Sequence, residues 1–439
     1  MFQTLINAFR NKDIRRKILI TLGLLLIYRF GCWLPIPGIS SDVYSGTAEG
    51  QTTNTLLYLL SSITGGALAN GAILAIGVSP YINASIIIQL LTVAIPKLEQ
   101  WAKQGDEGRK KINNVTRALT LFLAIAQGIG IVVSWANTNS INAAVFGSKA
   151  PTWVVAMLVC IILVSGSMFT MWLGERMTEI GIGNGISLLI FVGILSTAGT
   201  NIIAVASNIP GDETNTALFQ LLGFILLVVF IFAFIVFIDL SERRIPIQYA
   251  KQIKGRKQYG GQNTNIPIKV NASGVMPIIF ANAIITFPQL LFSLFLNTDN
   301  AFYVWWMTWL GVGTPIYSVV VGLLILAFSY FYATIQFNPE EVARNIQQYG
   351  GFIPGIRPGK QTSEYLARIS KRLTFFGAIF LAIIAIVPSI IFSFVLGGQG
   401  ELINAFSSTG MLIVVSVALE LDKQLQSQLM MKQYKGFLK

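Results

Sequence analysis

Ten long apolar runs dominate this sequence, and each is close to the roughly 20 residues that a helix needs to cross a bilayer. Charged residues make up only 11% of the chain, about half the share found in soluble domains, and they fall almost entirely between the runs. The pattern therefore predicts an all-α polytopic membrane protein with ten transmembrane helices. The runs cover approximately residues 18–34, 72–95, 116–136, 152–173, 182–206, 216–240, 272–296, 315–336, 372–396 and 402–421.

The net charge of +12 is distributed unevenly along the chain. If the N-terminus is cytoplasmic and the runs alternate in direction, the five outside loops hold a single basic residue, Lys149, and the inside segments hold nearly all the others. Arg29 is the exception, near the outer end of the first run. Because basic residues collect on the cytoplasmic side of membrane proteins, both termini are predicted to be cytoplasmic. The charge thus indicates a membrane and cytoplasmic partners rather than nucleic acid.

The sequence offers no constellation suited to catalysis or metal binding. It contains no histidine, and its two cysteines, Cys32 and Cys160, lie in apolar runs where packed thiols are expected. Arg29, Asp239 and Glu420 lie towards the ends of runs, where long side chains can reach the membrane surface. We therefore expect no catalytic residue, no metal, no cofactor and no enzymatic activity, so any uphill transport would need energy from a partner.

Ten spans divide naturally into two halves of five. A unit with an odd number of spans that is repeated once must enter the membrane from opposite sides, which gives an inverted repeat. The second run of each half shows a faint likeness, between PYINASIIIQLL (80–91) and PIIFANAIITFPQLL (277–291). We predict an N-terminal half over 1–206, a C-terminal half over 207–421 and a cytoplasmic tail over 422–439, with these two helices facing each other.

The stretch from Ser61 to Leu91 does not read as one spanning helix. A continuous helix of this length would measure roughly 46 Å, well beyond a hydrocarbon core of about 30 Å. Four glycines and a Ser-Pro pair interrupt its first part, and only the residues after Pro80 form a clean apolar run. Two interpretations stay open from the residues alone. The segment is re-entrant and either closes a path through the protein or serves only packing.

Two inside loops, about 241–271 and 338–371, are unusually long and mix basic residues with aromatics, Gly and Pro. The first alternates apolar and polar residues at RIPIQYA and again at NIPIKV, which is typical of a two-stranded hairpin. Such a hairpin around the basic GRKQYGG tip would project as an ordered surface. A patch for anionic lipid is the alternative interpretation of these bases.

Five stretches, in this order, resemble the SecY family, the channel subunits of the bacterial Sec protein translocon. They are GGAL…PYINASIIIQLL, ERMTEIGIGNGIS, KVNASGVMPIIFA, GFIPGIRPG and GMLIVVSVALE. The resemblance implies a clamshell of two inverted five-helix halves with a re-entrant plug helix. It also implies a multi-pass channel in the cytoplasmic membrane of a bacterium, which passes unfolded secretory polypeptides and releases membrane segments sideways into lipid.

The resemblance assigns roles to residues as well. It implies a pore ring of five isoleucines at mid-membrane, which would exclude water at rest. It implies that a plug half-helix over about 57–70 closes the outer funnel, and that the two facing helices form a lateral gate held by polar contacts. The expected residues are Ile82, Ile86, Ile190, Ile279 and Ile413 in the ring and Leu57, Gly65, Gly66 and Asn70 in the plug. Their polarity and position, rather than a motif, place Gln89, Thr92 and Asn282 at the gate.

The basic loops resemble the family's docking surface for cytoplasmic partners. The resemblance implies SecE and SecG as partner subunits, the SecA motor ATPase, the ribosome, signal peptides, nascent polypeptides, membrane lipid and further copies of the channel as partners. The docking residues expected here are Arg243, Arg244, Lys254, Arg256, Lys257 and Arg357.

Two other functions are alternatives to a general channel. An accessory SecY paralogue for a restricted substrate set would share these motifs. A five-plus-five secondary transporter would need a binding site near the membrane midplane, usually with an ionisable residue, and none is evident.

Overall fold

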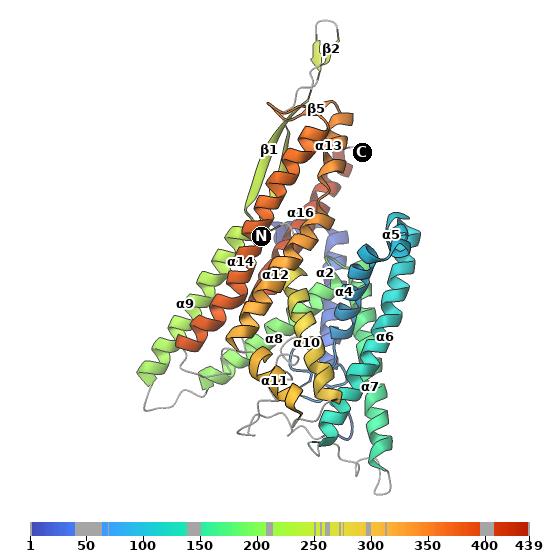
Figure 1. The fold of residues 1–439 in the computed structure, drawn as a ribbon, viewed down its shortest axis with the longest axis vertical. Helices are drawn as coiled ribbons and strands as arrows, with labels where there is room; N and C mark the ends of the chain where they lie inside the picture. The colour runs from blue at the N-terminus through green and yellow to red at the C-terminus, as the bar shows by residue number, and fades with distance from the viewer. Residues whose placement is uncertain are drawn as a thin grey trace.

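We describe the chain from a computed structural model. The described residues are 2–39, 64–68, 70–137, 151–207, 214–249, 252–254, 257–259, 264–271, 274, 276–295, 300–311, 314–395 and 408–437. The molecule is a bundle of long helices with a β-hairpin that projects from one end (Figure 1).

Each of the ten predicted apolar runs overlaps one long helix. Within the described residues, four helical stretches are long and apolar enough to span a membrane, and five if a bent pair counts as one. The membrane-type fold is therefore confirmed, and ten crossings stay a prediction. The ten helices are α2 (Lys12–Gly31), α4 (Ser79–Ala94), α6 (Asp106–Asn137), α7 (Thr152–Ile180), α8 (Gly185–Ser207), α9 (Thr214–Asp239), α10 (Met276–Phe295), α12 (Pro315–Gln336), α14 (Lys360–Val395) and α16 (Ser408–Phe437).

Short helices border the long ones: α1 (Phe2–Arg10), α5 (Pro96–Lys103), α11 (Ala301–Leu310) and α13 (Pro339–Gln348). The bent pair is α4 and α5, which meet at 101° because Ile95, the residue before Pro96, takes an extended conformation. Helix α1 packs against α16, where Ala8 and Leu425 share a small apolar cluster. The first and last described helices therefore lie at the same end of the molecule.

The predicted hairpin is confirmed. Strand β1 (Glu242–Tyr249) pairs antiparallel with β4 (Thr264–Lys269), and Ile245 lies opposite Ile266. Two short strands, β2 (Gln252–Lys254) and β3 (Lys257–Tyr259), pair with each other farther out, at the top of Figure 1. The other edge of β1 pairs with β5 (Gly351–Phe352), which comes from the second long loop.

The two long loops thus form one packed unit, which we call the hairpin module: β1, β4, β5, α13 and the start of α14. Ile245 and Ile247 point from β1 into an apolar cluster with Ile346 of α13 and Leu366 of α14. Burial alternates along β1, as the sequence pattern predicted. Because the module has its own core, it can present a surface of fixed shape outside the helical bundle.

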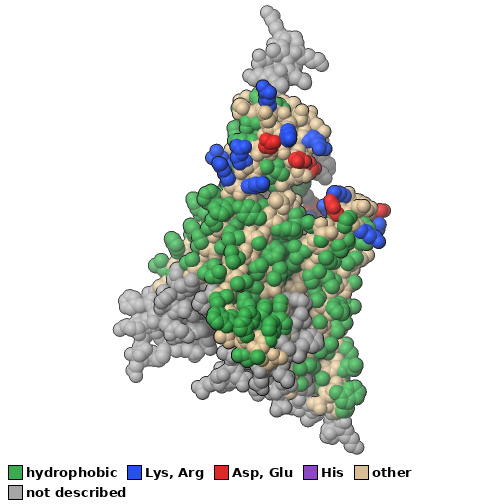
Figure 2. Space-filling model, in the orientation of Figure 1, with side chains coloured by type: hydrophobic (Ala, Val, Ile, Leu, Met, Phe, Trp, Pro, Cys, Tyr) green, Lys and Arg blue, Asp and Glu red, His purple; other side chains and the backbone are tan. Residues whose placement is uncertain are grey.

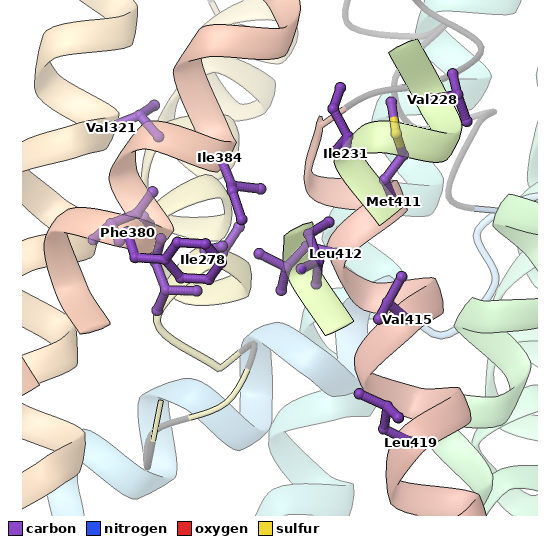
Figure 3. Packing of buried hydrophobic residues seen from close by; sticks show 14 of the residues in the cluster. Val228, Ile231, Ile278, Val321, Phe380, Ile384, Met411, Leu412, Val415 and Leu419 are labelled. Carbon is purple, nitrogen blue, oxygen red and sulfur yellow. The ribbon is translucent and has the colours of Figure 1, made fainter. Parts of the chain in front are cut away.

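Three apolar clusters organise the bundle. The buried residues of the first-half core come from the stretch Ile36 to Leu163, and those of the second-half core come from Val228 to Leu419. Figure 3 shows the second-half core, where side chains of α9, α10, α12, α14 and α16 meet. The third, which we call the boundary cluster, draws on both predicted halves, from Tyr28 to Val417.

Charged side chains gather at one end of the molecule. On the face in Figure 2, Lys, Arg, Asp and Glu lie over the hairpin module and over the end that carries α5, while the flank below is mainly hydrophobic. Large exposed apolar side chains on the long helices include Leu226 of α9 and Leu323 of α12. An extended apolar flank beneath a charged end is the surface that a membrane-embedded bundle needs.

Candidate pore constriction and closing segment

Four of the five isoleucines expected in the pore ring meet in the boundary cluster. Ile190 of α8 and Ile413 of α16 are buried there, and Ile82 of α4 and Ile279 of α10 pack against them from partly buried positions. Ile86, one turn along α4 from Ile82, is also buried but is not a member of this cluster. The structure thus brings together side chains from four helices and from both predicted halves.

The segment directly before α4 forms turns where the sequence predicted the end of a plug half-helix over about 57–70. Residues 64–68 and 70–78 form successive turns, and Leu57 lies outside the described residues. Gly65, Gly66, Gly71 and Gly77 all have positive φ values, between 54° and 84°, which a regular helix does not contain. The described end of the predicted half-helix therefore forms turns, the rest of 57–70 lies outside the described residues, and the apolar run predicted to begin at residue 72 becomes helical only at Ser79.

This closing segment, residues 64–78, is fastened to the chain that follows α2. The backbone N–H of Ile36 donates to Gly71 O at 2.9 Å, and that of Ile73 donates to Leu34 O at 3.0 Å. Side chains of the segment, among them Leu74 and Val78, enter the boundary cluster beside the isoleucines. The segment therefore packs directly on the candidate constriction, as a plug would.

Arg29 does not extend towards a membrane surface, as the sequence suggested. Its Nη1 donates to the backbone oxygen of Gly65 at 3.0 Å, and its Nη2 donates to the hydroxyl of Ser196 on α8. Sequence gave no sign of these partners, which lie 36 and 167 residues away.

The three expected gate residues have different roles in the structure. The Tyr332 hydroxyl of α12 donates to Oε1 of Gln89 on α4, so this bond joins the two predicted halves. The hydroxyl of Thr92 donates to Ile88 O of its own helix at 2.7 Å, so the prediction of an interhelical bond is wrong there. Asn282 is partly buried on α10.

The two helices predicted to face each other are joined indirectly. Helix α10 packs mainly against α12 and α6, and α4 packs mainly against α6 and α5. Phe280 of α10 contacts the Tyr332 ring, with centroids 4.9 Å apart. Tyr332 therefore links α10 to Gln89, and neither the apolar pattern nor the motifs of the sequence marked this residue.

The predicted docking bases lie on or near the hairpin module. Arg243 and Arg244 are exposed on β1, where Arg244 forms an ion pair of 2.7 Å with Glu242, and Arg357 is exposed after β5. Lys254 belongs to β2 and Lys257 to β3, and Arg256 lies outside the described residues.

A polar junction at the base of the hairpin was also missed. Asp239, at the end of α9, accepts from Asn271 Nδ2 at 2.8 Å and from the Ser416 hydroxyl at 3.0 Å. Ser416 lies on α16, three residues after Ile413. Nearby on α16, burial and the ammonium of Lys269 lower the pKa of Lys423. The junction connects the hairpin to the helix that carries a predicted ring residue.

Among the described residues, no group of three His, Cys, Asp or Glu side chains could hold a metal ion. Cys32 is buried and Cys160 partly buried, and both are free thiols. The described part of the site therefore consists of apolar side chains and hydrogen-bonding groups.

Comparisons with known proteins agree on the family. The family model described as SecY matches residues 72–421. The chain is 40% identical to the protein translocase subunit SecY of Halalkalibacterium halodurans over 443 aligned positions, which cover all of both chains. It is also 40% identical to that of Staphylococcus carnosus, with 100% of this chain and 99% of the relative covered.

Solved structures give the same fold. One described as a protein conducting channel superposes with a TM-score of 0.62 at 20% identity, covering 94% of this chain and 91% of that one. Sec61 from a canine ribosome-channel complex superposes with a TM-score of 0.59 at 19% identity, with the same coverage. The SecY-like fold predicted from sequence is confirmed, and this chain belongs to the SecY family.

Proposed function

We propose that this chain forms the channel of a bacterial protein translocase, which passes unfolded polypeptides across the cytoplasmic membrane and releases apolar segments sideways into lipid. One observation carries the proposal: four isoleucines from both halves meet in the boundary cluster, with the closing segment packed on them. An aliphatic constriction excludes water and ions at rest and has no charge to hold a passing chain.

The comparisons support this function. The curated relatives that match over their whole length are named protein translocase subunits, and one matching structure is described in terms of a plug domain that maintains a membrane seal. These full-length matches do not favour a dedicated paralogue. A transporter is not favoured either, because Arg29, the ionisable residue noted in the first helix, bonds to a backbone oxygen and a serine rather than facing a binding site.

Gln89 and Tyr332 are proposed to hold the lateral gate. Their hydrogen bond lies between α4 and α12, and a bond of this kind between membrane helices stabilises the closed arrangement by about 1 kcal/mol. A hydrophobic signal helix could replace so weak a contact. The gate would thus open to lipid without breaking either half's own core.

The hairpin module is proposed to dock cytoplasmic partners. Its packed apolar core and its exposed Arg243, Arg244 and Arg357 suit acidic protein surfaces or RNA phosphates. Sec61 and yeast Ssh1, whose structures this chain resembles, were solved with ribosomes. We infer that SecA and the ribosome bind at this module, that SecE and SecG bind the helical flank, and that both termini are cytoplasmic.

A crosslink tests the pore. Cys32 and Cys160 are replaced, a single cysteine is placed at Ile190, and the protein is reconstituted with SecE, SecA and ATP. The substrate is a secretory precursor that carries one cysteine and is stalled midway by a folded C-terminal domain. We expect a disulfide that requires both ATP and the signal sequence.

The matched control places the cysteine at Leu226, whose side chain is 72% exposed on the apolar flank. A polypeptide in the pore cannot reach it, so no crosslink is expected there. Equal crosslinking at both positions, or none at either while SecA is bound, would contradict the proposed pore.

A further inference from the structure

The guanidinium of Arg29 joins three segments that are far apart in sequence. It lies on α2 and donates to Gly65 O of the closing segment and to the Ser196 hydroxyl of α8. Nearby, the Cys32 thiol lies 3.8 Å from Thr64 O, so two successive carbonyls of the closing segment contact side chains of α2 and its end. Arg29 is the one basic residue that the sequence places towards the outer end of an apolar run.

The closing segment is shaped to receive this arginine. Gly65 has a φ of +71°, and a Cβ atom at this position would lie 2.4 Å from Arg29 Nη1 and 3.0 Å from the Cα of Gly193 on α8. Any side chain here would displace the guanidinium of Arg29 and crowd the backbone of Gly193. The contact between backbone and guanidinium therefore depends on glycine at position 65.

A charged group inside a membrane protein is stable only with polar partners or water. In the present arrangement Arg29 is half-buried and has a carbonyl and a hydroxyl as partners, beside the apolar boundary cluster. If the closing segment moved while the constriction stayed dry, Arg29 would lose a partner and gain none. If the segment moved as the pore filled with water and polypeptide, water would replace that partner.

We propose that Arg29 is a positioning residue that holds the closing segment on the constriction and couples its release to hydration of the pore. The inference rests on the proposed channel function and specifies how the resting state is maintained. It differs from a purely structural role, in which Arg29 would stabilise the fold equally whether the pore is closed or open.

The experiment compares Arg29→Met with Arg16→Met, which removes an exposed arginine from the charged end of the same helix. The purified complex with SecE is placed in planar bilayers, and ion conductance is measured without precursor. Because a charge-assisted hydrogen bond is lost, we expect the basal conductance of Arg29→Met to rise about tenfold, with Arg16→Met unchanged. Arg29→Lys should give an intermediate rise, since one ammonium reproduces the charge but not the two-pronged geometry.

Two further variants keep the test decisive if Arg29→Met does not fold. Gly65→Ala displaces the guanidinium from the opposite side of the contact, and Ser196→Ala removes its other acceptor. Both should raise basal conductance while the thermal unfolding midpoint stays near that of the parent protein. Parental conductance in the folded variants would overturn the proposal, as would a lowered midpoint without added conductance.

Translocation separates this inference from the function on which it rests. A precursor with a weakened signal sequence should cross Arg29→Met about fivefold faster than the parent channel, and a precursor with an intact signal should cross at nearly the same rate. Equal rates for the weakened precursor would overturn the positioning role and leave the channel function standing. Failure of the parent protein to move any precursor would count against the function, while basal conductance would still decide the role of Arg29.

Discussion

The second-half core and the boundary cluster are both apolar and buried, but they connect different parts of the chain. The second-half core draws only on α9, α10, α12, α14 and α16, whereas the boundary cluster joins helices from both predicted halves and the closing segment. Separating the halves would therefore disrupt the boundary cluster and leave the second-half core intact. On the proposed function, the second-half core therefore serves the stability of the fold and the boundary cluster serves the opening of the channel.

The largest expected effect is on stability, from the second-half core. Ile325 of α12 is fully buried, so Ile325→Ala should lower the free energy of unfolding by about 2–5 kcal/mol, through the cavity it leaves, with basal conductance unchanged. Unfolding in mixed micelles measures the difference. Leu323→Ala, at a position 61% exposed on the same helix, is the control, and an equal loss there would contradict the distinction between core and flank.

A polar substitution in the boundary cluster should affect conductance instead. Ile190→Asn places an amide that holds water in the candidate constriction, and we expect basal conductance to rise about tenfold. Ile231→Asn, at a buried position of the second-half core, is the matched change and should lower stability without opening a path for ions. If both variants behaved alike in planar bilayers, the two clusters would not be functionally distinct.

The polar contact between the halves should have a smaller effect. Gln89→Leu and Tyr332→Phe each remove one bond of about 1 kcal/mol, so photocrosslinking of a signal peptide to lipid-facing positions should increase about fivefold. The double variant should add nothing to either single one, since both remove the same bond. Additive effects would show that the two residues act separately.

Thr92→Val should have almost no effect on the gate. Its hydroxyl bonds to Ile88 O within α4 and does not reach another helix. We expect signal-peptide crosslinking to stay within about twofold of the parent level. This corresponds to about 0.5 kcal/mol, the usual range for a change away from a key contact. A change as large as that of Gln89→Leu would mean that Thr92 contacts the second half when the gate moves.

The order of helices and strands along the chain could be predicted from sequence, because the membrane imposes helix length and charge placement. The ten apolar runs, the break at Pro80 and the alternation at RIPIQYA correspond to helices, a helix start and strand β1. These features depend on residues that are neighbours in the chain. The SecY motifs then identified five isoleucines, four of which the structure brings together in the boundary cluster.

Features that depend on distant partners could not be predicted. Glycines at 65, 66, 71 and 77 indicated an interrupted helix, but a half-helix and a series of turns have the same glycine content. A polar residue in an apolar helix can bond either to its own backbone or to another helix. The sequence therefore could not show that the hydroxyl of Thr92 bonds to Ile88 O of its own helix rather than across the gate. Asp239 showed no sign of its bond to Ser416, 177 residues away.

The bond between Gln89 and Tyr332 has a consequence for how cargo is sorted. At about 1 kcal/mol, thermal fluctuation breaks such a contact roughly one-sixth of the time, so on the proposed function this bond does not by itself hold the gate against a passing segment. Each passing segment then partitions between the watery pore and the lipid according to its own hydrophobicity. Each segment can partition between pore and lipid many times during its passage, so sorting approaches an equilibrium. The channel then needs no residue that recognises a particular sequence.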